Sequence, residues 1–235
     1  MTADEHPALR VMTYNVHGLR DPGVADVVRA CRPDVLALQE PPRGPGGRAR
    51  LLRFAGRTGM RLVVGGGGAR TTALLVVAHR RVTDARAVRL PWRPGLTRRG
   101  ASTALVDGVR VVVVHLGLRA DERLRHVGRL GARVLRDATR ADELVVVLGD
   151  LNERPGSPAW SALAESAALV DAAAEAGVDD PTYPADEPRV RIDAVLADPL
   201  LPVVGALVPA DDPVARASDH RPLVVDLRLP DPPQG

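Results

Sequence analysis

Short apolar runs, separated by polar, Gly-rich or Pro-rich segments, extend from residue 9 to residue 229. The most apolar of these runs hardly alternate between apolar and polar positions, which predicts strands that are covered on both faces. Nine runs have the length and composition of strands: 9–16, 35–40, 61–65, 72–79, 102–108, 110–116, 144–150, 191–198 and 222–229.

Helical patterns lie between some of these strands. Residues 21–31 precede the second strand, and residues 120–137 carry apolar side chains at helical spacing with Arg on the other side. Residues 158–169 follow a Ser157-Pro158 start signal. Together the strands and helices predict an α/β (α+β) fold in which two sheets pack together and helices lie outside them.

The segments between these elements predict turns and loops. Four glycines at 65–68 predict a hairpin turn between strands, and 41–47 and 186–189 predict surface loops. No linker-like stretch divides the 235 residues. We therefore expect one domain over residues 9–229, with a flexible N-terminus at 1–8 and a flexible C-terminal tail at 230–235.

The composition is that of a globular protein, with 45% hydrophobic and 26% charged residues. All 32 basic residues are Arg, and the net charge of +3 permits an anionic substrate but falls short of a DNA-binding stripe. The single Cys31 excludes an intrachain disulfide and suits a reducing compartment. No apolar run approaches the length of a membrane span, so we expect a cytoplasmic protein without stable membrane association. We also expect a monomer.

Polar side chains end most of the predicted strands, where an Asp or Asn disfavours strand structure. Any one of them alone is more often a turn former than a functional group. Clustered carboxylates repel unless a cation neutralises them, and Asp, Glu and Asn oxygens are the ligands that Mg²⁺ or Mn²⁺ accepts. The residues are Asn15, Glu40, His115, Asp150, Asn152 and Asp193, followed by Ser218, Asp219 and His220 before the last strand.

Other chemistries fit the sequence less well. No Cys pair or His pair has zinc-ligand spacing, and the glycines at 65–68 lack the Lys and the helix of a P-loop. Ser218, Asp219 and His220 are adjacent, and neighbours in a strand point to opposite faces, so adjacency does not make them a catalytic triad.

The ordered motifs TYNVHG, PDVLALQE, VVVVHLGL, VLGDLNERPGSP, PTYP, RIDAVLAD and SDHRPLVVDL resemble the endonuclease/exonuclease/phosphatase superfamily, which has the deoxyribonuclease I-like fold. GDLN, RID and SDH in this order make the resemblance specific, and it covers nearly the whole chain. It implies a four-layer α/β/β/α sandwich of two packed mixed β-sheets, with the active site at one end of both sheets.

The resemblance also implies roles for the matching residues. Glu40 would be the principal ligand of a divalent metal, Mg²⁺ or Mn²⁺, supported by Asn15 and Asp219. Asp150 and Asn152 would align the attacking water and hold the phosphate or the metal.

Two histidines would complete the catalytic group. Asp193 would hydrogen-bond His220, which fixes its tautomer and favours its protonated form. His220 would then either activate the water or steady the phosphate. His115 would contact a phosphate oxygen or protonate the leaving group, and the residues expected to contact substrate are Asn15, His115, Asn152 and Arg191.

Several further residues have a structural interpretation beside the functional one. His17 stands where some nuclease members carry a metal-binding Asp, and either a phosphate contact or plain packing fits it. Tyr183 either packs beside the site or only forms a turn between prolines. Arginines outside the motifs are more often solvated than functional in an Arg-rich chain, and this discount applies to Arg43, Arg98, Arg99 and Arg191. The remaining histidines, His6, His79 and His126, are expected at the surface.

The main functional hypothesis is a divalent-metal-dependent phosphoesterase that hydrolyses a phosphodiester or phosphomonoester by in-line attack of an activated water. A small phosphate-ester substrate is favoured, because the loops are short and no aromatic residue is clustered with Arg in an obvious insertion. A DNA or RNA endo- or exonuclease of the same family is the alternative. A non-catalytic phosphate-binding module is the alternative from another class.

Overall fold

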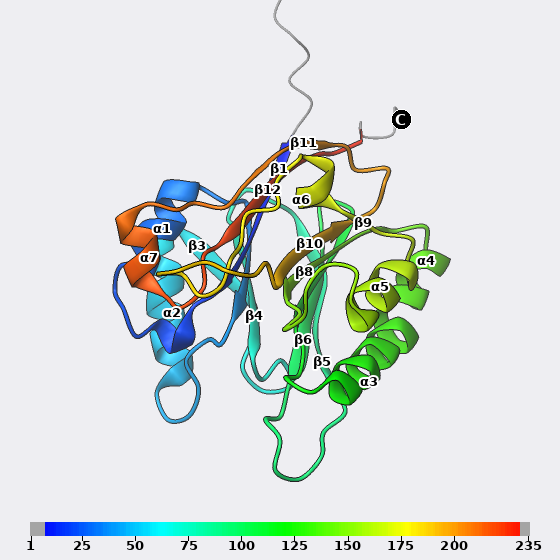
Figure 1. The fold of residues 1–235 in the computed structure, drawn as a ribbon, viewed down its shortest axis with the longest axis horizontal. Helices are drawn as coiled ribbons and strands as arrows, with labels where there is room; N and C mark the ends of the chain where they lie inside the picture. The colour runs from blue at the N-terminus through cyan, green and yellow to red at the C-terminus, as the bar shows by residue number, and fades with distance from the viewer. Residues whose placement is uncertain (1–7, 231–235) are drawn as a thin grey trace, which may run out of the picture.

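The computed structural model describes residues 8–230, in which two six-stranded mixed sheets pack face to face (Figure 1). In the first sheet β1 and β2 run parallel and the other neighbours run antiparallel. Its strands, in spatial order, are β11 (Val203–Leu207), β12 (Leu223–Arg228), β1 (Ala8–Asn15), β2 (Val35–Gln39), β4 (Thr72–Val77) and β3 (Met60–Gly65).

The second sheet repeats this plan. Its only parallel pair among the described residues is β7 with β8, which brings the ends of these two strands to the same edge. The strands, in spatial order, are β5 (Val82–Arg89), β6 (Gly100–Val106), β7 (Val109–His115), β8 (Leu144–Asp150), β10 (Asp193–Ala197) and β9 (Val170–Asp171).

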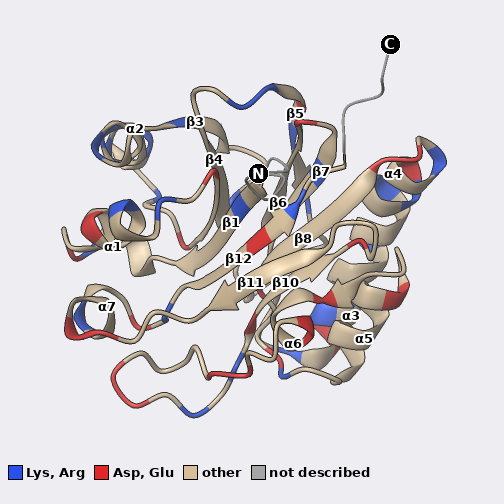
Figure 2. Ribbon diagram, turned by 90° about the horizontal axis from the view of Figure 1, so that it is seen from above, with Lys and Arg blue, Asp and Glu red and all other residues tan. Residues whose placement is uncertain are grey.

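Helices cover the outer faces of both sheets, and Figure 2 shows the two helical layers from above. The first sheet is covered by α1 (Val24–Cys31), α2 (Gly47–Thr58) and α7 (Asp212–Ala217), and a short 3-10 helix, η1 (His17–Leu19), follows β1. The second sheet is covered by α3 (Ala120–Leu130), the π-helical turn η2 (Gly131–Leu135), α4 (Arg136–Arg140) and α5 (Pro158–Glu165), while α6 (Ala172–Glu175) packs at the end of the inter-sheet core.

Apolar side chains fill three interfaces between these four layers. On β1, Leu9 and Val11 face the second sheet, whereas Met12 and Tyr14 face α1 and α2. Central strands of this kind are buried on both faces, and this is why their sequences do not alternate. The predicted α/β/β/α sandwich is therefore confirmed.

Some elements differ from those expected. Two of the edge strands, β5 and β11, were not predicted, because they are exposed and a register shift interrupts each of them. The predicted helix at 120–137 is α3, η2 and α4 in succession. The Arg-rich helix α2 follows the predicted loop at 41–47 and was also missed, together with the short elements β9, α6 and α7.

The glycine turn lies where the sequence predicts it, and most of the two predicted flexible ends lies outside the described residues. β3 and β4 pair antiparallel around the glycines at 65–68, as expected. Ala8 already belongs to β1, and the predicted flexible ends otherwise fall at residues 1–7 and 231–235, outside the described residues. Within residues 8–230, no helix has both the length and the apolar character needed to cross a membrane.

Candidate functional site

Three predicted site residues lie at the ends of neighbouring strands. The register of the second sheet places His115 of β7 and Asp193 of β10 on either side of Asp150 of β8. Gly149 makes this close approach possible, because its φ is 153° and a Cβ there would lie 1.9 Å from the carbonyl oxygen of Val114. The strand pairing therefore assembles two carboxylates and an imidazole at one edge.

Asp150 is the centre of this group and is almost completely buried. Its Oδ2 accepts a hydrogen bond from Asn15 Nδ2 at 3.2 Å and lies 3.4 Å from His115 Nε2. Its Oδ1 accepts the backbone N–H of Asn152 at 2.8 Å. Burial and then the charge of Asp193 raise the pKa of Asp150 to about 7, against the opposing effect of His220.

His220 is held against Asp193 on the other side of Asp150. Its Nδ1 lies 2.8 Å from Asp193 Oδ2, and its Nε2 lies 3.9 Å from Asp150 Oδ2. Burial acts to lower the pKa of His220, but the charge and hydrogen bond of Asp193, with Asp150 and Asp219, raise it to about 9. The ring of Tyr183 packs 4.8 Å from the His220 ring, so Tyr183 contacts the site.

His115 has the opposite protonation behaviour. Burial, followed by the charges of Arg99 and His220, holds the pKa of His115 well below its usual range. One imidazole of the cluster is therefore neutral at pH 7 while its neighbour carries a proton. Groups whose environments push their pKa values apart in this way are typical of acid–base sites.

Arg99 is a member of the site that sequence reasoning discounted as surface. It is only 7% exposed, and Nη1 donates to the carbonyl oxygen of His115 at 3.5 Å. Within residues 8–230 no carboxylate lies within ion-pair distance of Arg99. Burial lowers the pKa of its guanidinium, and the more distant charges of Asp150, Glu122 and Glu40 partly offset this effect. A buried guanidinium without a carboxylate partner is available for an anionic ligand.

Asn152 and Glu40 occupy turns that follow β8 and β2. Both have left-handed backbones, with φ of 52° and 53°. Asn152 Nδ2 donates to the carbonyl oxygen of Leu116 at 3.0 Å, which leaves the amide oxygen free to accept a hydrogen bond or bind a cation. The backbone of Glu40 is held by Thr71 and Gly18, and its side chain lines a cavity with His17, Arg20 and Arg43.

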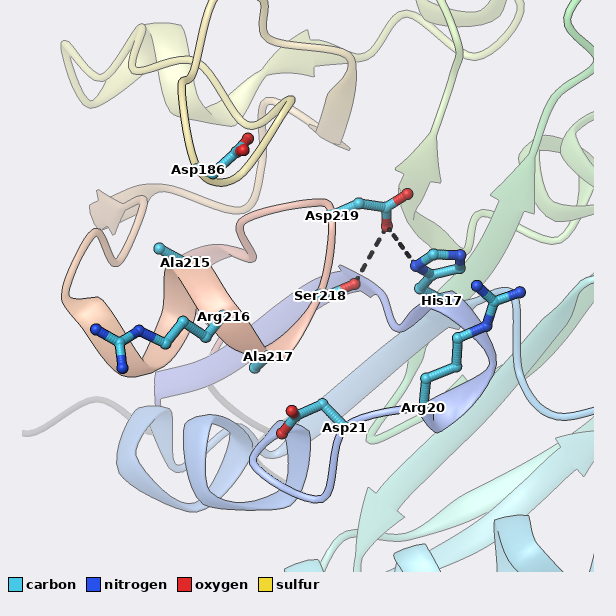
Figure 3. Close-up of a pocket in the computed structure, with 9 residues that line it drawn as sticks. All are labelled: His17, Arg20, Asp21, Asp186, Ala215, Arg216, Ala217, Ser218 and Asp219. Carbon is cyan, nitrogen blue, oxygen red and sulfur yellow. Dashed lines mark hydrogen bonds and ion pairs between the residues drawn. The ribbon is translucent and has the colours of Figure 1, made fainter.

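Asp219 and His17 form the neighbouring wall of the site (Figure 3). His17 Nδ1 lies 3.7 Å from Asp219 Oδ1, and Ser218 Oγ donates to the carbonyl oxygen of Asn15 at 2.7 Å. Ser218 therefore ties the last loop to the end of β1 and has no nucleophile-like arrangement with His220. Both His17 and Asp219 line a polar cavity of about 440 Å³.

The donor set suits a hard cation in its chemistry. The expected metal ligands supply carboxylate and amide oxygens without any thiolate, which is the preference of Mg²⁺ and Mn²⁺. The carboxylate of Asp219 is 45% exposed and that of Glu40 faces a cavity. No group of three or more His, Cys, Asp or Glu side chains in the described part of the chain is close enough together to hold a metal ion.

A family model described as the endonuclease/exonuclease/phosphatase family matches residues 12–220 of this sequence. The chain belongs to this family. Its members are hydrolases that act on phosphoester bonds, and every strand-end residue described above lies within the matched range. No curated protein is similar enough to the chain to count as a match.

Solved structures of this family and fold superpose on nearly the whole chain. A mannosyl-6-phosphatase from Bacteroides thetaiotaomicron has a TM-score of 0.79 at 15% identity, over 93% of this chain and 99% of that one. An endonuclease/exonuclease/phosphatase from Beutenbergia cavernae has a TM-score of 0.70 at 27% identity, over 97% and 73% of the two chains. ANGEL2, a 2′,3′-cyclic phosphatase, has a TM-score of 0.76 at 16% identity, over 94% and 96%.

Arg191 is the predicted substrate contact that the structure does not bring into the cluster. Its guanidinium is buried, and it donates to both carboxylate oxygens of Asp171 and to Asp179. It also lies over the Trp160 ring at 5.3 Å. Because these partners hold the guanidinium, we assign Arg191 to the packing of α5 and α6 and no longer expect it to contact phosphate.

Three further sequence interpretations need correction or confirmation. His126 is completely buried, so its expected surface position is wrong, and its Nε2 donates to the carbonyl oxygen of Pro91 at 3.1 Å. His79 is exposed as expected, and His6 lies outside the described residues. An aromatic residue is clustered with Arg after all, because Arg98 lies 4.2 Å from the Trp92 ring in the loop between β5 and β6.

Proposed function

We propose that the protein hydrolyses a phosphodiester by in-line attack of an activated water, in a reaction that depends on Mg²⁺ or Mn²⁺. The observation that carries this proposal is the position of two histidines beside Asp150, with Nε2 of His115 at 3.4 Å and Nε2 of His220 at 3.9 Å from Asp150 Oδ2. Burial lowers the pKa of His115, whereas the charge of Asp193 raises that of His220. Hydrolysis of a phosphoester needs positive charge at the phosphoryl oxygens and a group that removes a proton from water. This cluster supplies both within one buried site.

His220 is the proposed cation for the phosphoryl group. With a pKa of about 9 it remains an imidazolium at neutral pH, and Asp193 fixes its Nδ1 so that Nε2 is the free donor. Its protonated state favours steadying the phosphate over activating the water. Arg99 adds a second buried positive charge on the His115 side of the cluster.

Asp150 is the proposed proton acceptor. A carboxylate with a pKa near 7 is well matched to taking a proton from water at neutral pH. The backbone N–H of Asn152 fixes Asp150 Oδ1, and the free amide oxygen of Asn152 can orient the water. His115 is neutral, which supports a hydrogen bond to a phosphate oxygen rather than proton transfer from an imidazolium.

Glu40, Asp219 and Asn15 are the residues proposed to hold the metal, which leaves Asp150 as the proton acceptor. A bound divalent ion would supply charge at the phosphoryl oxygens and lower the pKa of a coordinated water. Asn15 also donates to Asp150, so it links the metal side of the site to the proton acceptor.

A small phosphate ester remains the favoured substrate. The cavities beside Glu40 and Asp219 are open and polar, and they measure about 210 and 440 Å³, which suits a headgroup or sugar. The Trp92–Arg98 pair favours the second candidate, a nuclease, since bases stack on exposed aromatic rings. The loop that carries this pair leads into β6, whose Ser102 pairs with Val113 two residues before His115.

Hydrolysis of bis(p-nitrophenyl) phosphate and p-nitrophenyl phosphate tests the proposal, with Mg²⁺, with Mn²⁺ and with EDTA. We expect metal-dependent release of nitrophenolate by wild type and its loss in His220→Gln. Glu165→Gln removes an exposed carboxylate on α5 and is the matched control. If neither these esters nor DNA, RNA or lipid headgroup esters are hydrolysed, the phosphate-binding module replaces the enzyme.

A further inference from the structure

A third cavity, distinct from those that contain Glu40 and Asp219, lies between the start of α2 and the glycine turn of β3 and β4. It has a volume of about 320 Å³, and three arginines line it: Arg43, Arg48 and Arg70. It shares Arg43 and the two prolines Pro41 and Pro42 with the cavity of Glu40. The two cavities therefore adjoin each other along the segment that follows β2.

The charge of this arginine pocket is unbalanced. No Asp or Glu lines it, and within residues 8–230 none of its three guanidiniums makes a hydrogen bond or an ion pair. By contrast, Arg10, Arg110 and Arg191 each contact one or more carboxylates. Like charges gathered in one concave site repel one another, and an anion removes that repulsion.

The backbone around the arginine pocket adds to its preference for anions. The first turn of the twelve-residue α2 contains Arg48 and no acidic residue, and its N-cap Gly46 provides no side-chain cap. The N–H groups of that turn carry the positive end of the helix dipole. Gly66 and Gly67 have φ of 74° and 47°, so the opposite wall is a turn of bare backbone that leaves room for a ligand.

We propose that the arginine pocket binds a second phosphate group of the substrate, next to the phosphoester that is hydrolysed. This inference rests on the proposed function and narrows its substrate to molecules with two phosphates. Guanidinium groups bind phosphate through paired, charge-assisted hydrogen bonds, and three of them favour a dianionic terminal phosphate over a monoanionic diester. The adjoining cavities allow one small molecule to occupy both.

The test compares three p-nitrophenyl esters of thymidine 5′-phosphate in the presence of Mn²⁺. The first has a free 3′-hydroxyl, the second a 3′-phosphate, and the third the methyl ester of that phosphate. We expect wild type to prefer the 3′-phosphate over the hydroxyl by about tenfold in kcat/KM, as one or two charge-assisted hydrogen bonds allow. The methyl ester, which models the next phosphate of a nucleic-acid strand, is expected to fall between them.

Arg48→Ala/Arg70→Ala is expected to lose this preference, so that the two rates differ by about twofold or less. Arg133→Ala/Arg136→Ala removes the same charge from exposed positions in the helical layer of the second sheet and is expected to keep it. The proposal is overturned if wild type shows no preference for the 3′-phosphate, or if the pocket variant retains it. A methyl ester that is as good as the free phosphate would assign the pocket to a nucleic-acid backbone instead.

Failure of the proposed function can be separated from failure of this inference. If no ester is hydrolysed by wild type, phosphate binding is measured by thermal unfolding in EDTA with inorganic phosphate as the ligand. A ligand that binds only the native state raises the melting temperature. The inference stands if phosphate raises the melting temperature of wild type and of Arg133→Ala/Arg136→Ala more than that of Arg48→Ala/Arg70→Ala. An equal shift in all three proteins overturns it.

Discussion

Asp193→Asn tests the electrostatic coupling that keeps His220 protonated. The carboxylate of Asp193 lies 2.8 Å from His220 Nδ1, and the pKa of His220 is about 9 against an ordinary value of 6.5. A difference of about 2.5 units corresponds to about 3 kcal/mol between the two protonation states. Burial opposes this shift, and Asp193 contributes the largest raising effects, so loss of its charge is expected to take the pKa of His220 below 7 even with Asp150 and Asp219 in place.

NMR titration of ¹³C-labelled histidines in EDTA measures this pKa directly, with His220→Gln to assign the resonance. We expect His220 to titrate near pH 9 in wild type and below pH 7 in Asp193→Asn. A wild-type pKa near 6.5, or one near 9 in the variant, would refute the coupling. Asp226→Asn, which removes a carboxylate that pairs with Arg10 on the first sheet, is the control and should leave the titration unchanged.

The same pKa shift predicts how stability depends on pH. Since the folded pKa is raised above the unfolded value, the stabilisation by His220 is fully present below pH 6.5 and is lost as the pH rises through 9. Urea unfolding of the metal-free protein should therefore lose up to about 3 kcal/mol over this range. Asp193→Asn should lose much less over the same range.

Three further predictions concern other residues. Burial lowers the pKa of His126 to about 4, so the neutral ring stabilises the fold above pH 6.5 and this contribution is lost as the pH falls toward 4. Urea unfolding of wild type should therefore lose roughly 3 kcal/mol over this range, and His126→Gln should not. If the free energy of unfolding of the variant falls with pH as steeply as that of wild type, His126 is not buried as a neutral ring. Arg99→Gln should lower kcat/KM for bis(p-nitrophenyl) phosphate by about tenfold to a hundredfold without lowering the melting temperature, and full activity would remove Arg99 from the site. Gly149→Ala places a Cβ 1.9 Å from the carbonyl oxygen of Val114, so it should lower the free energy of unfolding by more than about 3 kcal/mol. If the urea midpoint of the variant equals that of wild type, β7 and β8 can separate to admit the Cβ.

The sequence predicted the central strands because burial on both faces leaves continuous apolar runs. β7 is the clearest case, since Val111 and Val113 face the other sheet while Val112 and Val114 face the helices. The edge strands β5 and β11 bury little apolar surface, so their sequences carry no comparable signal. The resemblance to the family predicted which residues form the candidate site, and strand register explains why Asp150 and Asp193 are neighbours.

Side-chain partners set the limits of that prediction. Arg99 and Arg191 are both buried, yet Arg191 has two carboxylate partners and Arg99 has none in residues 8–230. Composition cannot separate such cases, because each partner comes from a distant part of the chain. The same holds for His126, which is buried and donates to the carbonyl oxygen of Pro91, and for Glu153, which caps α5 through the N–H groups of Ala159 and Trp160.

The most direct test of the account is the rate of bis(p-nitrophenyl) phosphate hydrolysis by wild type and by Asp150→Asn, each with Mn²⁺ and then with excess EDTA. Asp150→Asn keeps the shape of the side chain but removes its charge and its ability to accept a proton. We predict turnover by wild type that EDTA abolishes and that the variant lacks, while both proteins unfold cooperatively. Equal turnover by the variant, or turnover that persists in EDTA, would contradict a metal-dependent site centred on Asp150.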